Sequence, residues 1–394
     1  MVSNFARIFY FVIALILAAC SNESNTVSET AEIAEAANET IASVPKYSAE
    51  AFFATTSYGI VGSSAHAFSA DGNSLLISSD NTGVFNAYSL PLDGGKPSQL
   101  TMSDDNAIFA VSWFPNDDRI LYTYDGGGNE LNHVVVREID GSNRDLTPGD
   151  AVKASFVGWN SDGNSFYLLT TERNEQSFDL YRYSSDGYDR ELIYENPGFQ
   201  VSALSRDGRW LALDKPRTSA DSDIYVVDLS TGEKEPLLIT EHSGNVAFGT
   251  YDFTPDNRAV IYATDEHGEF SQAWRHDLET GEKSALIDAA WDVQYVAYSG
   301  SGKFRVSGIN ADARTEVTIT DLETGAETSL SGLPAGDLRN VRFSSDDSKV
   351  ALIVNADNSP SNIHLVNLAA GSAKQLTDAL SPEIDSEHLA VSEI

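Results

Sequence analysis

A short turn signal returns along this chain at a near-constant interval. Each copy places a serine or proline shortly before an aspartate, and glycine or a small polar residue usually follows; the copies are Ser69-Ala70-Asp71-Gly72, Pro115-Asn116-Asp117-Asp118, Ser161-Asp162-Gly163, Ser205-Arg206-Asp207-Gly208, Pro255-Asp256-Asn257, Ser299-Gly300-Ser301-Gly302 and Ser344-Ser345-Asp346-Asp347. Counted from the aspartate position, which Ser301 fills in the sixth copy, the steps are 46, 45, 45, 49, 45 and 45 residues. A repeat of this length is typical of a propeller blade, a small sheet that must stack on its neighbours to bury its faces. Seven copies predict a seven-bladed ring.

The first repeat shows how one blade is built. Four short segments rich in β-branched and aromatic residues are separated by Asp-Gly, Asn and Gly turns, and they are Ala65–Phe68, Leu75–Ser79, Val84–Leu90 and Gln99–Thr101. Later repeats keep this order, and no stretch between Tyr47 and Thr377 has a sustained helical period. The predicted fold is therefore all-β, a seven-bladed β-propeller of four-stranded antiparallel blades over residues 47–380. One large residue precedes each turn by a similar offset, which predicts equivalent inner-strand positions for Phe68, Trp113, Trp159, Leu204, Phe253, Tyr298 and Phe343.

The chain is strongly acidic and contains a single cysteine. Its 25 Lys and Arg residues stand against 59 Asp and Glu residues, which gives a net charge of −34. Such a surface repels phosphate backbones and anionic lipid, so nucleic acid is not an expected partner. The negative charge needs no specific partner to explain it, because a high net charge keeps a protein soluble. One cysteine also excludes an intrachain disulfide.

The position of that cysteine predicts export. Arg7 is followed by an apolar run from Ile8 to Ala19, which is too short for a membrane-spanning helix and typical of a bacterial signal peptide. The run ends Leu17-Ala18-Ala19-Cys20, which resembles the lipobox of bacterial lipoproteins. That resemblance implies cleavage after residue 19, lipid on Cys20, and a periplasm-facing protein of the cell envelope held to the membrane through its lipid anchor only. Ser21 after the cysteine favours the outer membrane by the same analogy, and an ordinary secretory signal with a chance cysteine is the alternative. Residues 1–19 are then a signal peptide, and residues 20–46, poor in large apolar side chains, are a flexible linker.

The blades resemble those of the periplasmic protein TolB and of the prolyl oligopeptidase family of serine peptidases. Segments outside the generic repeat favour the peptidases, in particular the bacterial acylaminoacyl-peptidase and dipeptidyl-aminopeptidase-like members; they are residues 47–56, 128–133, 215–223, 291–295 and 380–385. The resemblance covers about Tyr47 to Ile394. It implies a propeller that covers an active site and admits only peptides able to enter.

In that family an α/β-hydrolase domain of about 250 residues follows the propeller, and it carries a Gly-x-Ser-x-Gly nucleophile motif, an Asp and a His. No Gly-x-Ser-x-Gly occurs in this sequence, and residues 381–394 resemble only the connector toward such a domain. No catalytic residue is therefore carried over, and the chain is not expected to be catalytic alone. The expected partners are peptides, a hydrolase domain or a partner protein at one ring face. A stand-alone TolB-like envelope lipoprotein that binds a protein or peptide is the alternative function, and a scaffold without a small ligand is another.

Other chemistry has weak support in the sequence. The histidines show no metal-ligand spacing, no Asp-x-Asp-x-Asp-Gly calcium loop occurs, and no glycine-rich phosphate loop opens a helix, so neither a metal nor a cofactor is expected. Two polar segments are candidates for a surface that faces a domain or substrate. In one, Asn129 and Glu130 end a glycine-rich run that permits close backbone approach. In the other, Arg217 lies in a loop where it can pair with a carboxylate. A structural hairpin or salt bridge is the alternative at both places.

Overall fold

The computed structural model describes residues 45–328 and 330–391. The predicted signal peptide, Cys20 and all of the predicted linker except Pro45 and Lys46 lie outside these residues. The described residues from Tyr47 onward form one compact unit. Among the described helices, none has the length and apolar character that crossing a membrane requires.

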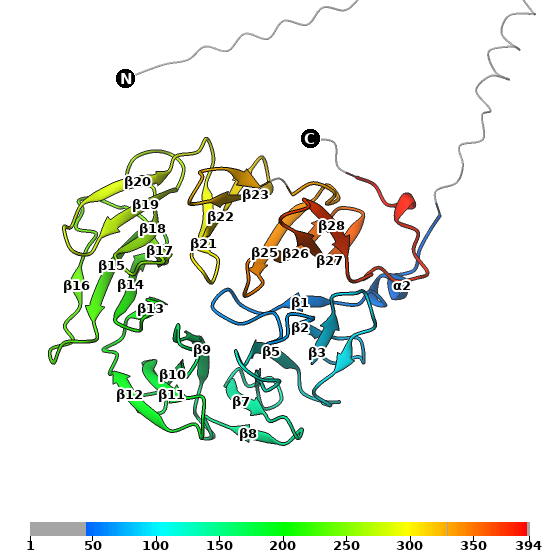
Figure 1. The fold of residues 1–394 in the computed structure, drawn as a ribbon, viewed down its shortest axis with the longest axis horizontal. Coiled ribbons are helices and arrows are strands. Elements are labelled where there is room, and N and C mark those ends of the chain that lie inside the picture. The colour runs from blue at the N-terminus through cyan, green and yellow to red at the C-terminus, as the bar shows by residue number, and fades with distance from the viewer. Residues whose placement is uncertain (1–44, 329, 392–394) are drawn as a thin grey trace, which may run out of the picture. The chain divides into compact units, whose positions relative to one another are not determined.

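Seven four-stranded antiparallel sheets are arranged as a ring, which confirms the predicted fold (Figure 1). The strands of blades 1 to 4 are β1 (Tyr58–Ile60), β2 (Ser74–Ser79), β3 (Asn86–Pro91), β4 (Ser98–Gln99), β5 (Ile108–Trp113), β6 (Ile120–Tyr124), β7 (His133–Arg137), β8 (Asn143–Asp145), β9 (Ala154–Trp159), β10 (Ser165–Thr170), β11 (Asp179–Ser184), β12 (Arg190–Tyr194), β13 (Gln200–Leu204), β14 (Trp210–Thr218), β15 (Asp221–Asp228) and β16 (Leu237–Leu238). Those of blades 5 to 7 are β17 (Phe248–Phe253), β18 (Ala259–Thr264), β19 (Gln272–Asp277), β20 (Lys283–Ile287), β21 (Val293–Tyr298), β22 (Phe304–Ala311), β23 (Arg314–Asp321), β24 (Glu327–Thr328), β25 (Asp337–Phe343), β26 (Lys349–Ala356), β27 (Ser359–Asn367) and β28 (Ser372–Gln375). Each sheet uses four strands that are consecutive in sequence, and the first of them lies nearest the centre of the ring (Figure 1).

Two short helices flank the ring in sequence. α2 (Ala49–Phe53) begins after Ser48, whose hydroxyl accepts a hydrogen bond from Ala51 N at 3.2 Å. The 3₁₀ helix η1 (Ser386–His388) follows the last blade, and the Asp385 carboxylate caps it by accepting from Glu387 N at 3.0 Å. Both caps satisfy backbone N–H groups that a helix start leaves without partners.

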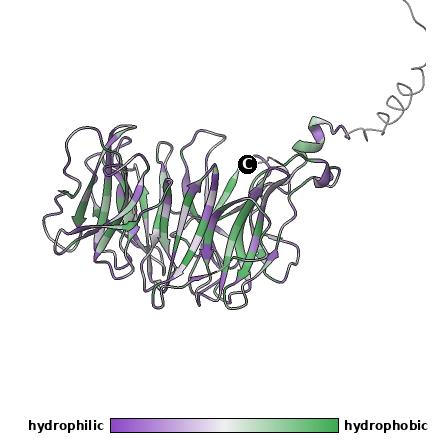
Figure 2. Ribbon diagram, turned by 90° about the horizontal axis from the view of Figure 1, so that it is seen from above, coloured by the Kyte–Doolittle hydropathy of each residue, from purple (hydrophilic) through white to green (hydrophobic). Residues whose placement is uncertain are grey.

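The core lies between neighbouring blades. The second strand of a blade is the most apolar, because it has a strand on either side and a neighbouring blade over each face. In β2, for example, Leu75, Leu76 and Ile77 are fully buried in succession. Figure 2 shows the same pattern as hydrophobic strands between hydrophilic loops at the two rims of the ring.

The predicted equivalent positions are confirmed by strand register. Each of the seven residues pairs with the residue seven positions further along, on the second strand; the pairs are Phe68–Leu75, Trp113–Ile120, Trp159–Phe166, Leu204–Leu211, Phe253–Val260, Tyr298–Arg305 and Phe343–Val350. The predicted first strand Ala65–Phe68 is wrong in extent. The strand there is Tyr58–Ile60, and Phe68 keeps only an isolated bridge, because the chain loops out between Ile60 and Phe68.

The recurrent turn is held by its own side chains. In the first copy Ser69 Oγ donates to the Asp71 carboxylate at 2.6 Å, while Ser74 N donates to Ser69 Oγ at 3.0 Å. The fourth and seventh copies repeat the serine–aspartate bond at 2.6 and 2.7 Å. The repeated aspartate is therefore explained by turn chemistry.

The sixth turn borrows its carboxylate from the next blade. Ser301 stands where other copies have aspartate, and the buried Asp347 of blade 7 accepts hydrogen bonds from both Ser299 Oγ, at 3.1 Å, and Ser301 Oγ. Asp347 itself occupies the left-handed position, at φ 55°, where four of the other copies have glycine. The pair Ser301 and Asp347 thus ties blade 6 to blade 7.

We expect Ser301→Asp to destabilise the ring, because it places a second carboxylate against the buried Asp347. Adding Asp347→Gly to it restores the Ser-x-Asp-Gly pattern of the other turns and should recover most of the loss. The coupling free energy between the two substitutions is expected to be about 1–3 kcal/mol. Urea denaturation of the single and double variants measures this coupling. Additive effects of the two substitutions would contradict the conclusion that Asp347 supplies the carboxylate of the sixth turn.

Ring closure relies on packing between blades 1 and 7, because no described strand crosses from one to the other. Ala351, Ile353 and Ile363 of blade 7 belong to the core cluster of blade 1. Across the same junction, Arg342 Nε donates to the carbonyl of Val61 at 2.7 Å, and burial lowers the pKa of Arg342 to about 10. Among the described residues the ends of the ring therefore meet through packed side chains and hydrogen bonds and not through an exchanged strand.

Candidate functional site

Strand direction divides the loops of the ring between two faces. In an antiparallel blade the turn between strands one and two lies opposite the loop between strands two and three. The second kind of loop shares its face with the connectors between blades, with residues 47–57 that lead into β1, and with residues 376–391 that leave β28. We call this the exit face of the ring, and the short helix α2 lies on this side in Figure 2. Asn129, Glu130 and Arg217 all lie on the exit face.

Asn129 and Glu130 belong to the β6–β7 loop, which is held mainly by its own residues. The Asp125 carboxylate accepts from Glu130 N at 3.0 Å and from Gly128 N at 3.3 Å, while Asn129 Oδ1 accepts from Leu131 N at 3.0 Å. Gly127 and Gly128 adopt positive φ, which requires glycine at a tight turn of this kind. The glycine-rich run is thus a structural turn that presents the Glu130 side chain at the surface.

Arg217 lies near the tip of the long β14–β15 hairpin and is paired within blade 4. Its guanidinium donates to both oxygens of Asp221 at 2.8 Å, it contacts Asp223, and it lies 3.1 Å from His242 Nε2. The hydrogen bonds from Arg217 hold the pKa of Asp221 well below its usual range. The Thr240 carbonyl, which lies 2.9 Å from Nδ1, and the Asp221 carboxylate raise the pKa of His242. Arg217 therefore has its carboxylate partners inside the hairpin.

The structure does not bring these candidates into one site. No hydrogen bond or ion pair between described residues links the 126–130 loop of blade 2 to the hairpin of blade 4, and blade 3 separates them. They share a face, and each has a local structural role.

Sequence reasoning missed the exposed apolar side chains of the exit face. Phe53 of α2 is 88% exposed, and Phe52, Met102, Phe109 and Trp291 are also exposed on this face. Two aromatic pairs are formed there, Phe85 with Phe109 at 5.2 Å between ring centroids and Phe270 with Trp291 at 5.5 Å. The sequence signal that could have found them is an aromatic residue in a predicted loop or blade connector, because a side chain there does not fill the core of a blade.

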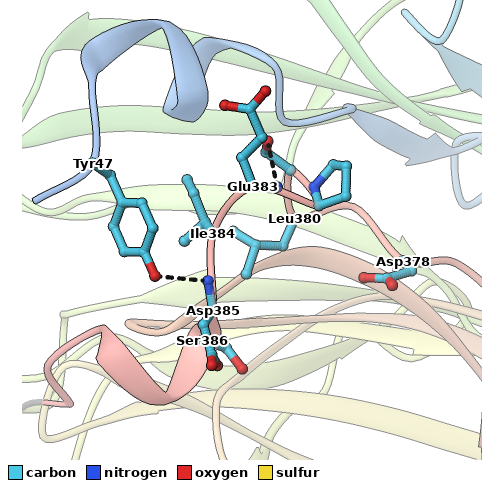
Figure 3. Close-up of a pocket in the computed structure, with 9 residues that line it drawn as sticks. Tyr47, Asp378, Leu380, Glu383, Ile384, Asp385 and Ser386 are labelled. Atoms are coloured by element: carbon cyan, nitrogen blue, oxygen red, sulfur yellow. Dashed lines mark hydrogen bonds between the residues drawn. The ribbon is translucent and has the colours of Figure 1, made fainter. Parts of the chain in front are cut away.

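A hollow of about 490 Å³ lies where the lead-in and exit segments meet (Figure 3). Asp378, Glu383 and Asp385 contribute carboxylates to its lining. Tyr47 of the lead-in points toward the exit segment, where its hydroxyl accepts from Asp385 N at 3.0 Å and lies 2.7 Å from His388 Nδ1. Thr56 N also donates to the carbonyl of Ala379 at 2.9 Å. These contacts clasp the two ends of the ring together on the exit face.

The described histidines, acidic residues and serines form neither a metal site nor a catalytic triad. No group of three or more His, Cys, Asp or Glu side chains in this part of the chain is placed to hold a metal ion. Among the described residues no serine hydroxyl is hydrogen-bonded to a histidine ring, and from His66 the Ser112 Oγ accepts only the backbone N–H, at 3.0 Å. His133 does pair with Asp145 at 2.7 Å, but its other ring nitrogen lies 3.1 Å from the carbonyl of Gly149, which is a structural arrangement.

The fold and the clasped ends define the class of protein, a seven-bladed propeller whose chain enters and leaves on one face. The family model for the prolyl oligopeptidase N-terminal beta-propeller domain matches residues 97–379. The chain belongs to this family.

Solved structures of other proteins share this fold. A solved prolyl endopeptidase superimposes with a TM-score of 0.64 at 14% identity, over 86% of this chain and 52% of its own length. An oligogalacturonate lyase in complex with manganese superimposes with a TM-score of 0.59 at 15% identity, over 79% and 90%. At such identities the likeness concerns the fold alone.

A curated relative, the TolB homolog of Chlorobium luteolum, is 28% identical over 189 residues, 43% of this chain. The match spans 40% of that relative's length, and the chain covers about half of the prolyl endopeptidase.

Proposed function

We propose that this ring is the substrate-gating propeller of an exported serine peptidase of the prolyl oligopeptidase family. In this proposal the exit face covers a hydrolase domain that supplies the nucleophile, the base and the oxyanion donors. The ring limits access to peptides small or flexible enough to enter, and it performs no hydrolysis itself.

The observation that carries the proposal is the placement of both chain ends. The lead-in and the exit segment are clasped together on one face, through Tyr47 and the backbone of Thr56. A domain joined to this ring is thereby directed to that face. The same face exposes Phe52 and Phe53, large apolar side chains that a docked domain would remove from water.

The 394-residue chain alone should show no turnover of peptide, amide or ester substrates. The native protein that carries this ring should react with a serine-directed covalent probe and should cleave short peptides, while folded proteins stay intact. Peptidase assays with and without the probe measure both. Probe-sensitive turnover by the isolated chain would contradict the proposal, and a native protein with no probe-reactive serine would favour a TolB-like binding module.

Export and lipid attachment at Cys20 form part of the proposal. We expect Cys20→Ala to move the protein from the membrane fraction to the soluble envelope fraction. In the proposal Cys20 carries all of the acyl chains, and stable anchoring needs two or more of them. Ser24→Ala is the matched control and should leave the protein in the membrane. Mass spectrometry of the wild-type N-terminus should show acylated Cys20, and an unmodified cysteine in the membrane fraction would contradict the anchor.

A further inference from the structure

Two loops of the exit face combine an exposed tryptophan with five carboxylates, two of which have no partner among the described residues. They are the β18–β19 loop, residues 265–271, and the β20–β21 connector, residues 288–292. Together they contain Asp265, Glu266, Glu269, Asp288 and Asp292, and neither loop contains a lysine or an arginine. Trp291 is 41% exposed, and its ring contacts that of Phe270.

The two loops are joined by hydrogen bonds. Ser271 N donates to Asp292 Oδ1 at 2.8 Å, and Val293 N donates to the carbonyl of Ser271 at 2.8 Å. The Gln272 side chain links both loops as well, since its Nε2 donates to the Trp291 carbonyl at 3.2 Å and its Oε1 accepts from Ala289 N at 2.6 Å. A surface fixed in this way loses little conformational entropy when it binds a ligand.

The carboxylates of these loops fall into two groups. Asp292 accepts from Ser271 N, Asp265 accepts from Ala247 N at 2.8 Å, and Glu266 lies 3.7 Å from His267 Nε2, so these three have partners. Glu269 and Asp288 are exposed and make no hydrogen bond or ion pair with any described residue. We call Glu269, Phe270, Asp288 and Trp291 the blade 5 patch.

We propose that the blade 5 patch binds a lysine- or arginine-bearing segment of a peptide. An ammonium or guanidinium group is attracted to the face of a tryptophan, and it makes charge-assisted hydrogen bonds with carboxylates. Neither loop contains lysine or arginine, and the histidine in them, His267, lies against Glu266. The carboxylates of Glu269 and Asp288 therefore have no cationic partner within the two loops. Trp291 lies two residues before β21, the innermost strand of blade 6, so the patch adjoins the centre of the ring. This inference rests on the proposed function and extends it, because it names cationic peptides as the class of substrate that the ring admits.

The test measures binding to the full chain and needs no hydrolysis. Blocked pentapeptides that lack tryptophan and contain either two lysines or two glutamates are titrated, with tryptophan fluorescence and calorimetry as readouts. The lysine peptide should bind and change the fluorescence, the glutamate peptide should not, and salt should weaken the binding. In Trp291→Phe the fluorescence change should disappear.

A matched pair of variants locates the site. Glu269→Gln with Asp288→Asn should weaken binding of the lysine peptide about tenfold, the scale of losing hydrogen bonds to charged groups. Glu282→Gln with Glu323→Gln removes the same charge from the opposite face and should leave the affinity unchanged. Equal binding of the two peptides, no binding of either, or equal losses in the two double variants would overturn the proposal. Because binding is read without turnover, a native protein with no reactive serine but an intact lysine-peptide site would overturn the gating function alone.

Discussion

Asp252→Asn is expected to stabilise the ring at neutral pH. Asp252 lies on the inner strand β17, and the only hydrogen bond to its carboxylate from a described residue comes from Phe253 N, at 2.7 Å. Burial raises the pKa of Asp252 to about 6, against an ordinary value of 3.8. A raised pKa means that the folded state holds the proton more tightly than the unfolded state. The contribution of Asp252 to stability is therefore present near pH 4, falls as the pH rises to about 6, and is lost above that range.

The asparagine side chain keeps an oxygen for Phe253 N and removes the charge. The gain should approach about 3 kcal/mol above pH 7, the upper limit for a two-unit pKa difference, and should vanish near pH 4. Denaturation curves across this pH range measure it. Asp256→Asn is the control of opposite sign, because hydrogen bonds from Thr254 and Arg258 outweigh burial and lower the pKa of Asp256. A destabilised Asp252→Asn variant at pH 7, or a gain independent of pH, would contradict the prediction.

Asp179→Ala is expected to be destabilising. The Asp179 side chain is fully buried at the start of β11. It accepts from Arg173 Nε at 2.6 Å and Nη2 at 2.8 Å, and from Asn196 N at 2.8 Å. Its removal leaves the buried backbone N–H of Asn196 without an acceptor, which costs about 1–3 kcal/mol. The Arg173 side chain, which is 40% exposed, loses its carboxylate partner but can turn to water.

Blade 3 also supplies the matched control. Arg182 and Glu191 form an ion pair of similar length, 2.6 Å, but their side chains are 46% and 62% exposed. Glu191→Ala should change the free energy of unfolding by less than about 1 kcal/mol, because water screens exposed pairs. Similar losses in the two variants would show that burial does not set the strength of the Asp179 pair.

The repeat, the blade number and the equivalent positions were predictable from sequence because they depend on local chemistry. A Ser-x-Asp-Gly turn satisfies its own backbone, as Ser69 and Asp71 show, so it leaves the same pattern in each repeat. Blade 1 was the exception. Its inner strand lies at Tyr58–Ile60, and the loop that separates it from Phe68 follows no repeat pattern.

The functional surface was less accessible to sequence reasoning. Arg217 was a reasonable candidate as an arginine in an acidic chain, but the turn of its hairpin brings Asp221 and Asp223 to it and gives it a structural partner. Phe270 and Trp291 are 21 residues apart in sequence, and only the hydrogen bonds between their two loops bring them into one patch. The borrowed carboxylate of Asp347 joins two blades in the same way.

The sequence by itself determined the fold class, the number of blades and the acidic character of the chain, because period, turn chemistry and charge are properties of neighbouring residues. Only the tertiary structure decided which polar groups are satisfied and which remain free for a partner. That distinction depends on side chains brought together from distant blades, such as Asp347 with Ser299, and on the burial that raises the pKa of Asp252. Burial and long-range pairing arise when the seven sheets stack into a ring, and no local pattern records them.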